Sequence, residues 1–248
     1  MSGSGKVLLL APHPDDELVG AAIALARARA QGVAVSVLFL TTGIPQECWP
    51  WEGSTYANRV QKRREEAGKV AERLGFDIET ALEIPSRRLI GHLDGLRAVL
   101  SKLKADQLWV PAYEGAHQDH DAANALGFSL RSQFEVIEFA EYNFAGGGVI
   151  ANRFPDGDGE ILALTREEMD LKRQLLGLYE SERGNLDYVG CVQECRRPLA
   201  LYDYARPAHE GRLFRERFHW VPFRHPRIDW MAQANINAAL SKFTSRFA

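Results

Sequence analysis

The segment that most constrains the fold is an apolar run near the N-terminus that ends at a proline and leads directly into ionisable residues. The run is Val7–Leu10, and the sequence continues Ala-Pro-His-Pro-Asp-Asp-Glu to position 17. Proline cannot donate the next hydrogen bond of a ladder, so the run predicts a buried strand that stops sharply. Residues 17–30 carry apolar side chains at helical spacing, and Gly32 follows as a stop signal. A strand, a tight turn and a helix are the repeating unit of open α/β sheets, which bind ligands at such turns.

A second segment repeats this arrangement later in the chain. Gln107–Pro111 predicts another short buried strand that ends in proline, and residues 122–130 predict a helix. The loop between them reads His-Gln-Asp-His-Asp over residues 117–121. Carboxyl ends of parallel strands meet at one edge of a sheet, so we expect the two clusters of ionisable residues to face each other.

The residue types in the two clusters favour a metal site. His13 and Asp16 are three positions apart on a proline-stiffened loop, so they can converge on one cation and leave Asp15 free for other work. Catalytic zinc typically takes three protein ligands of the N/O type and keeps a position open. His13, Asp16 and either His117 or His120 would complete such a set. We expect Zn²⁺, with Fe²⁺ as the alternative ion, because ligand type alone discriminates poorly between them.

At these residues the chain resembles the PIG-L/LmbE-like N-acetylglucosaminyl deacetylase family. The P-H-P-D-D-E segment of that family stands here at residues 12–17, and its H-x-D-H segment stands at residues 117–120. The resemblance extends through Arg63 to the Tyr-Glu-Ser run at residues 179–181, and it is poor from about residue 183 onward.

The resemblance implies a set of metal ligands and a base. His13, Asp16 and His120 would be the zinc ligands, and Asp15 would be the general base that takes a proton from the metal-bound water. Hydrolysis of an unactivated amide calls for these groups independently, because a metal must lower the pKa of its water to about 7 to make a nucleophile at neutral pH.

The resemblance also implies roles for residues around the metal. His117 would stabilise the oxyanion or donate a proton to the departing amine, with Asp119 orienting it and keeping it protonated. Arg63 matches a position that contacts the sugar substrate. Members of the family can carry a tyrosine two residues before the first histidine of the second motif, whereas this chain has Gly115 there and Tyr113 out of register.

The alternation of elements predicts the fold class. Further strands are expected over residues 33–40, 78–84 and 134–142, and further helices over residues 56–74, 93–103 and 166–178. This alternation predicts an α/β, Rossmann-like, mostly parallel sheet with helices on both faces and the metal site at the carboxyl ends of the strands.

Composition bounds the domain organisation and the partners. The 248 residues are 46% hydrophobic, which suits one α/β domain over residues 1–248 with a divergent C-terminal extension from about 183. A formal net charge of -3 argues against nucleic acid as the partner. The three cysteines suit a reducing compartment, and no run of residues resembles a membrane span or a signal peptide. We therefore expect a cytoplasmic protein.

Three segments are candidates for specificity or assembly. Trp49 and Trp51 follow the second strand and are candidates for stacking on a sugar ring. Arginines alternate with aromatic residues from 206 to 227, a pattern that favours a half-exposed strand over residues 212–221 and also suits phosphate binding. Residues 228–243 predict an amphipathic helix that packs on the body of the protein or on a second subunit of a homo-oligomer.

Together these features predict a zinc-dependent hydrolase that removes an N-acetyl group from a small amino-sugar-containing substrate by attack of a metal-bound water. One alternative is hydrolysis of another amide, such as a thiol conjugate or an acylated natural product. A second is a nucleotide-binding module at the same sheet edge. The absence of a G-x-G-x-x-G turn after the first strand argues against this alternative. A third is a metal-binding protein without turnover, although a purely structural site needs no spare carboxylate such as Asp15.

Overall fold

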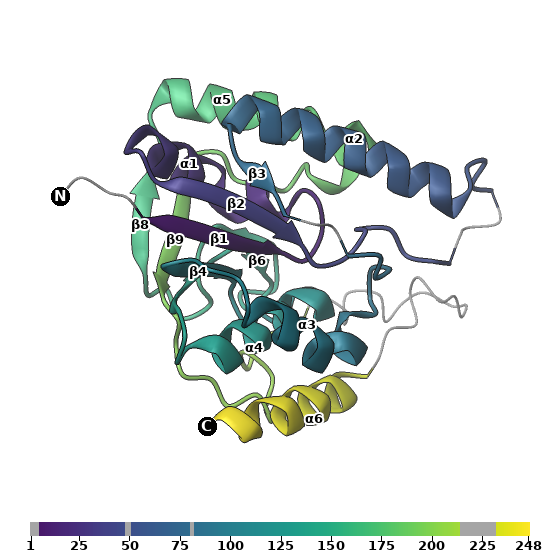
Figure 1. The fold of residues 1–248 in the computed structure, drawn as a ribbon, viewed down its shortest axis with the longest axis vertical. Helices are drawn as coiled ribbons and strands as arrows, with labels where there is room; N and C mark the ends of the chain where they lie inside the picture. Colours follow the sequence, from purple (N-terminus) through teal and green to yellow (C-terminus); the bar gives the residue numbers. More distant parts are fainter. Residues whose placement is uncertain (1–4, 48–50, 80–81, 214–231) are drawn as a thin grey trace.

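A computed structural model describes residues 5–47, 51–79, 82–213 and 232–248. Its strands are β1 (Lys6–Ala11), β2 (Ala34–Phe39), β3 (Asp77–Ile78), β4 (Gln107–Pro111), β5 (Glu135–Phe139), β6 (Tyr142–Asn143), β7 (Ile150–Ala151), β8 (Glu160–Ala163) and β9 (Gln193–Pro198). Seven of them form one sheet in the order β3-β2-β1-β4-β5-β9-β8, and β6 pairs with β7 in a separate hairpin (Figure 1). The first five strands of that order are parallel, and the β5–β9 and β9–β8 pairs are antiparallel. The predicted α/β class with a mostly parallel sheet is confirmed.

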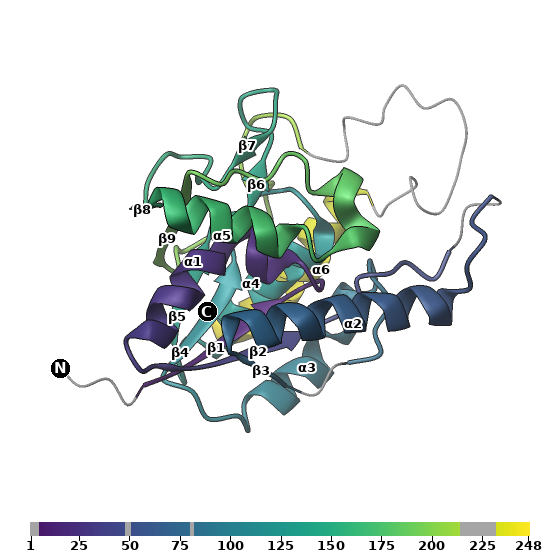
Figure 2. The same cartoon turned by 90° about the horizontal axis from the view of Figure 1, so that it is seen from above.

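Helices cover both faces of this sheet. They are α1 (Asp16–Ala30), α2 (Tyr56–Leu74), α3 (Leu93–Leu100), α4 (Gln118–Leu130), α5 (Arg166–Leu176) and α6 (Gln233–Thr244), with short 3₁₀ turns η1 (Leu89–His92), η2 (Glu180–Asn185) and η4 (Ser245–Phe247). Helices α1, α2 and α5 lie over one face and α3, α4 and α6 over the other, as the two views show (Figures 1 and 2).

The alternation of side chains along β1 explains why both faces are covered. Val7 and Leu9 pack into the core under α1, α2 and α5, whereas Leu8 and Leu10 pack into the core under α3, α4 and α6. Successive side chains of a strand point to opposite faces, so a continuous apolar run is the pattern of a strand that is buried on both sides.

The strand order reverses between β1 and β4. From β1 the chain first builds outward through β2 and β3, and it then returns to place β4 on the other side of β1. The loops that follow these two neighbouring strands lead to helices on opposite faces of the sheet, and the carboxyl ends of strands at such a point are where open α/β sheets bind ligands. Both histidine loops begin there.

Several sequence-based elements are confirmed to within a residue or two. The helix over residues 56–74 is α2, which begins after the N-cap Thr55 and ends before Gly75 at φ 74°. The strand over residues 107–111 is β4, and the helix expected over residues 166–178 is α5 with a capping box at Thr165.

Two expected strands were too long. The strand over residues 78–84 is only β3, which pairs with β2 at two positions. Further along, the chain leaves the sheet and bonds to the loop after β2, where Ile84 accepts from the Thr42 N–H (2.8 Å) and the Ser86 N–H donates to Ile44 (3.1 Å). The strand over residues 134–142 breaks after Phe139, and β6 then starts at Tyr142.

The C-terminal part completes the sheet and covers the second face. Strands β8 and β9 were not expected from the sequence, and they extend the sheet beyond β5. The amphipathic helix expected over residues 228–243 is α6, whose Ile236, Leu240 and Phe243 are buried against the face that also carries α4. Most of the strand expected over residues 212–221 lies outside the described residues. Among the residues that are described, no helix is both long and apolar enough to cross a membrane.

Candidate metal centre

The turn after β1 holds three ionisable side chains in a strained backbone. Asp15 has φ 136°, a conformation that L residues rarely adopt. Its N–H donates to Glu17 Oε2 (2.9 Å), and the other oxygen of Glu17 accepts from the Tyr179 hydroxyl (2.7 Å). The His13 N–H donates to Asp16 Oδ2 (2.7 Å). These hydrogen bonds fix the turn from inside, so His13, Asp15 and Asp16 project from a rigid loop.

The turn after β4 is equally constrained. Gly115 has φ 61°, and its N–H donates to Asp121 Oδ1 (3.1 Å). A Cβ added at Gly115 would lie 2.5 Å from Leu213 Cδ2, so a side chain at this position would require Leu213 to move. His117 is the N-cap of α4, where its Nδ1 accepts from the Asp119 N–H (3.1 Å), and His120 lies in the first helical turn.

The two turns bring three donor atoms to one point. His13 Nδ1 lies 3.1 Å from Asp16 Oδ2, and His120 Nε2 lies 3.4 Å from both of those atoms. Ligands at about 2.1 Å from a tetrahedral ion are about 3.4 Å apart, so the three atoms match one zinc coordination shell. His13, His117 and His120 also offer nitrogens within 4.8 Å of one another. The structure therefore brings together the set of His13, Asp16 and His120, and it places His117 close to the other two histidines.

The charge balance of the site also fits a divalent cation. Burial disfavours the charged ring of His13, yet Asp16 and Asp119 outweigh it and raise its pKa to about 9. Burial acts against the Asp16 carboxylate, but the rings of His120 and His13 hold its pKa well below the usual range. Without a metal these rings would hold protons to balance the carboxylates, and a bound cation replaces those protons.

Asp119 lies at a different ring from the one expected. Its Oδ2 is 3.1 Å from His13 Nε2 and 3.7 Å from His117 Nδ1. The Arg87 N–H donates to the same oxygen (2.5 Å), and the Ser86 hydroxyl lies 3.2 Å from His13 Nε2. The His117 Nδ1 already accepts a backbone hydrogen bond, so the Asp119 carboxylate is better placed to orient His13 than to keep His117 protonated.

Asp15 lies beside the donor atoms and is paired with an arginine. Burial raises its pKa well above the usual range, and Arg63 opposes that shift from 3.4 Å. The sequence assigned Arg63 to substrate contact, but its side chain is 1% exposed. It donates to the Pro14 carbonyl (2.9 Å) and the Ser181 hydroxyl (3.0 Å), and it also pairs with Glu182. Arg63 is thus a support for the turn that carries Asp15.

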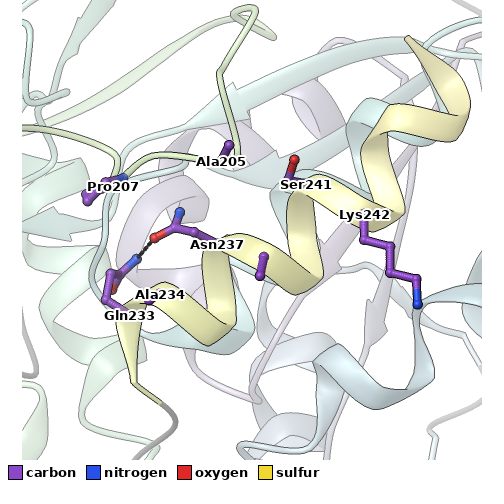
Figure 3. A pocket seen from close by; sticks show the side chains of 8 residues that line it. Ala205, Pro207, Gln233, Ala234, Asn237, Ser241 and Lys242 are labelled. Atoms are coloured by element: carbon purple, nitrogen blue, oxygen red, sulfur yellow. Dashed lines mark hydrogen bonds between the residues drawn. The ribbon is translucent and has the colours of Figure 1, made fainter.

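Trp49 and Trp51 are the other substrate contacts that the sequence predicts. Trp49 lies outside the described residues, and Trp51 is 74% exposed. A cavity of about 750 Å³ lies between α6 and residues 205–207, where Gln233 and Asn237 are joined by a hydrogen bond (Figure 3). None of the histidines or aspartates of the metal centre lines it.

Sequence reasoning missed a fourth acidic residue at this site. Glu141 is fully buried between β5 and β6, and its Oε2 lies 3.0 Å from His120 Nδ1. Burial raises its pKa to about 7. Asp16, His120 and Glu141 also form a cluster with the spacing of metal ligands. The strand expected over residues 134–142 carries acids at positions 135, 138 and 141, and this spacing does not distinguish Glu141 from the other two.

Comparison with known proteins places the fold in a family. The family model described as "PIG-L: GlcNAc-PI de-N-acetylase" matches residues 8–130. No curated protein matches the chain by sequence.

Solved structures share the fold over most of their length. The zinc-inhibited form of teicoplanin deacetylase Orf2 is 17% identical, with 80% of this chain and 99% of that chain covered and a TM-score of 0.59. N,N'-diacetylchitobiose deacetylase from Pyrococcus horikoshii is 20% identical, with coverage of 88% and 87% and a TM-score of 0.55. GalB, a 4-carboxy-2-hydroxymuconate hydratase from Pseudomonas putida KT2440, is 17% identical, with coverage of 80% and 97% and a TM-score of 0.52. At these identities the likeness shows the fold.

The residues matched by the family model run from within β1 to the end of α4 and so include both histidine turns and Arg63. This match, in agreement with the resemblance of the two histidine motifs, assigns residues 8–130 to the PIG-L family of de-N-acetylases.

Proposed function

We propose that this protein is a zinc-dependent hydrolase that removes the acetyl group from the nitrogen of an amino-sugar-containing molecule. The observation that carries the proposal is the meeting of His13 Nδ1, Asp16 Oδ2 and His120 Nε2 within 3.1–3.4 Å, beside the buried carboxylate of Asp15. The family description and two structural neighbours, a teicoplanin deacetylase and an N,N'-diacetylchitobiose deacetylase, support an N-acetylated sugar or sugar conjugate as the substrate class.

The three donors would hold the ion, which when bound supplies Lewis acidity and lowers the pKa of water to about 7. Asp15 takes the proton of the attacking water, because it is the carboxylate beside this point that is not needed as a ligand. Its burial raises its pKa and so makes it a better proton acceptor than an ordinary aspartate. Arg63 holds the turn in place while that proton moves.

His117 is placed to serve the second half of the reaction. Its Nδ1 accepts from the Asp119 N–H, so the remaining nitrogen, Nε2, is the one that can carry a proton to the departing amine. Its ring packs edge-on against His13 with centroids 4.6 Å apart, which keeps it within the site. Positioned acids and bases of this kind contribute about 10²–10⁴-fold each.

Metal analysis combined with acetate release tests the proposal. We expect one divalent ion per chain and release of acetate from some members of a panel of N-acetylated sugars, free, nucleotide-linked and lipid-linked. His13→Ala should lose both metal and activity. His92→Ala is the matched control, because His92 is exposed in η1 and the variant should keep both.

The same panel separates the alternatives. Amine release without acetate would indicate another amide, such as a thiol conjugate or an acylated natural product. Loss of an unsaturated acid without any amide cleavage would indicate a hydratase, the activity of one structural neighbour. A protein that binds nucleotides but no metal would refute the hydrolase assignment altogether.

A further inference from the structure

Each of the two histidines expected at the metal has its other ring nitrogen facing a buried carboxylate. His13 Nε2 lies 3.1 Å from Asp119, and His120 Nδ1 lies 3.0 Å from Glu141. We propose that Glu141 is a positioning residue of the metal centre, which holds the His120 ring in the tautomer that presents an unprotonated Nε2 to the ion. This inference rests on the proposed function and extends it to a residue beyond the region that the family model matches.

The backbone around Glu141 is anchored on both sides. Glu114 Oε2 accepts from the N–H groups of Glu141 (3.2 Å) and Tyr142 (2.9 Å), and the Glu141 carbonyl accepts from the Asn152 N–H (2.9 Å). Glu114 belongs to the turn after β4 that also carries the histidines. The position of Glu141 is therefore tied directly to the loop whose histidine it faces.

The Glu141 carboxylate has little else to bind. It is fully buried, and within the described ranges neither of its oxygens accepts a hydrogen bond of regular geometry, whereas the His120 ring lies at ion-pair distance, 3.0 Å from Oε2. Its other charged neighbours include the acids Asp16 and Glu114, which repel it. Burying an unpaired carboxylate destabilises the folded state by several kcal/mol. We therefore take the His120 ring as the partner that offsets this cost at Glu141.

The geometry also selects the nitrogen that is left for the metal. A proton on His120 Nδ1 can be shared with Glu141, and Nε2, which lies 3.4 Å from Asp16 Oδ2, then has a free lone pair. The Tyr142 ring packs edge-on against the His120 ring with centroids 5.6 Å apart, so the ring cannot turn without displacing it. Carboxylates of this kind raise the basicity of a ligating histidine and fix its orientation.

Replacement of Glu141 by glutamine tests the inference. The amide keeps the size of the side chain but removes its charge, and its NH₂ can donate to Nδ1 and so favour the wrong tautomer. We expect the Kd for Zn²⁺, measured against a chromophoric chelator at fixed pH, to rise about 10–100-fold. Glu135→Gln is the matched control, because Glu135 is an exposed acid on β5 whose loss should leave the Kd unchanged.

A second measurement distinguishes positioning from a general structural role. In Glu141→Gln the rise in melting temperature caused by added zinc should shrink, because a weaker Kd for zinc stabilises the folded protein less at the same zinc concentration. A lower melting temperature without metal together with an unchanged zinc-induced rise would overturn the inference. So would a Kd within twofold of that of the unmodified protein. If the unmodified protein binds no divalent ion, the proposed function fails as well.

Discussion

Replacing Arg63 by glutamine separates two opposing interpretations of this residue. The sequence motif predicts a substrate contact, whereas in the structure the side chain is 1% exposed and its donors are engaged by Pro14, Asp15, Ser181 and Glu182. If Arg63 supports the catalytic turn, the variant should lose stability and kcat together and keep its KM.

The expected loss of stability follows from the charges that Arg63 leaves behind. Breaking a buried ion pair by removing one partner costs about 3–5 kcal/mol. Asp15 stays buried with an 11% exposed side chain, but Glu182 is 19% exposed and regains some hydration, so the lower end of that range applies. For a chain of this size about 3 kcal/mol corresponds to a fall in Tm of roughly 6–12 °C.

The pH dependence of the rate gives an independent test of the role of Arg63. Arg63 lowers the pKa of Asp15, so its removal raises that pKa further. Asp15 must be ionised to accept a proton, and therefore the acidic limb of the pH–rate profile should move to higher pH. Urea unfolding of the metal-free protein and steady-state kinetics of acetate release measure the two effects.

Arg64→Gln is the matched control for this experiment. Arg64 is the next residue on α2, its side chain is 41% exposed, and it pairs with the exposed Glu83. An exposed pair of this kind is worth at most about 1 kcal/mol, so the control should behave like the unmodified protein. A raised KM with unchanged kcat and unchanged Tm in Arg63→Gln would refute the supporting role and restore the sequence-based assignment.

Three further predictions concern the metal centre. Asp15→Ala should keep its metal and lose roughly 10²–10⁴-fold in rate, whereas His13→Ala should lose the metal. Metal content and kcat measured on the same samples test this prediction, and the reverse pattern would exchange the two roles. His117→Ala should likewise bind zinc normally and turn over slowly, and a loss of zinc would make His117 a ligand instead. The apparent zinc affinity should rise with pH up to about 9, because binding displaces the proton that Asp16 and Asp119 hold on buried His13; a chelator competition series from pH 6 to 9 checks this, and a flat profile would contradict it.

Local sequence patterns predict the part of the fold that places the site. The apolar runs of β1 and β4, each closed by a proline, were sufficient to predict two strands and the meeting of their loops. The signals were strong because a strand buried on both faces must be apolar throughout. The same patterns predicted His13 and Asp16 and left the third ligand open between His117 and His120, and the resemblance to the family then favoured His120.

The parts that escaped prediction depend on contacts between distant segments. Ser86 reaches His13 only because the chain leaves the sheet after β3 and bonds to the loop after β2. Glu141 reaches His120 because the strand breaks after Phe139, which no local signal announces. Arg63 lies on a helix rich in charged residues, and only the packing of η2 against α2 shows that it is buried.

The separation of the two histidine turns along the chain has a consequence for how the protein folds during its synthesis. His13 and His120 are 107 positions apart, and each lies on a different side of the point where the strand order reverses. During synthesis the first turn leaves the ribosome with two of the three donors. The third donor joins them only after β4 has been made and has docked beside β1. In the proposed site all three donors are present only after β4 has docked, so complete binding of the ion would be a late event. A bound ion would then tie two distant segments together as a reversible crosslink, and the supply of metal in the cell would affect how long each folded copy lasts.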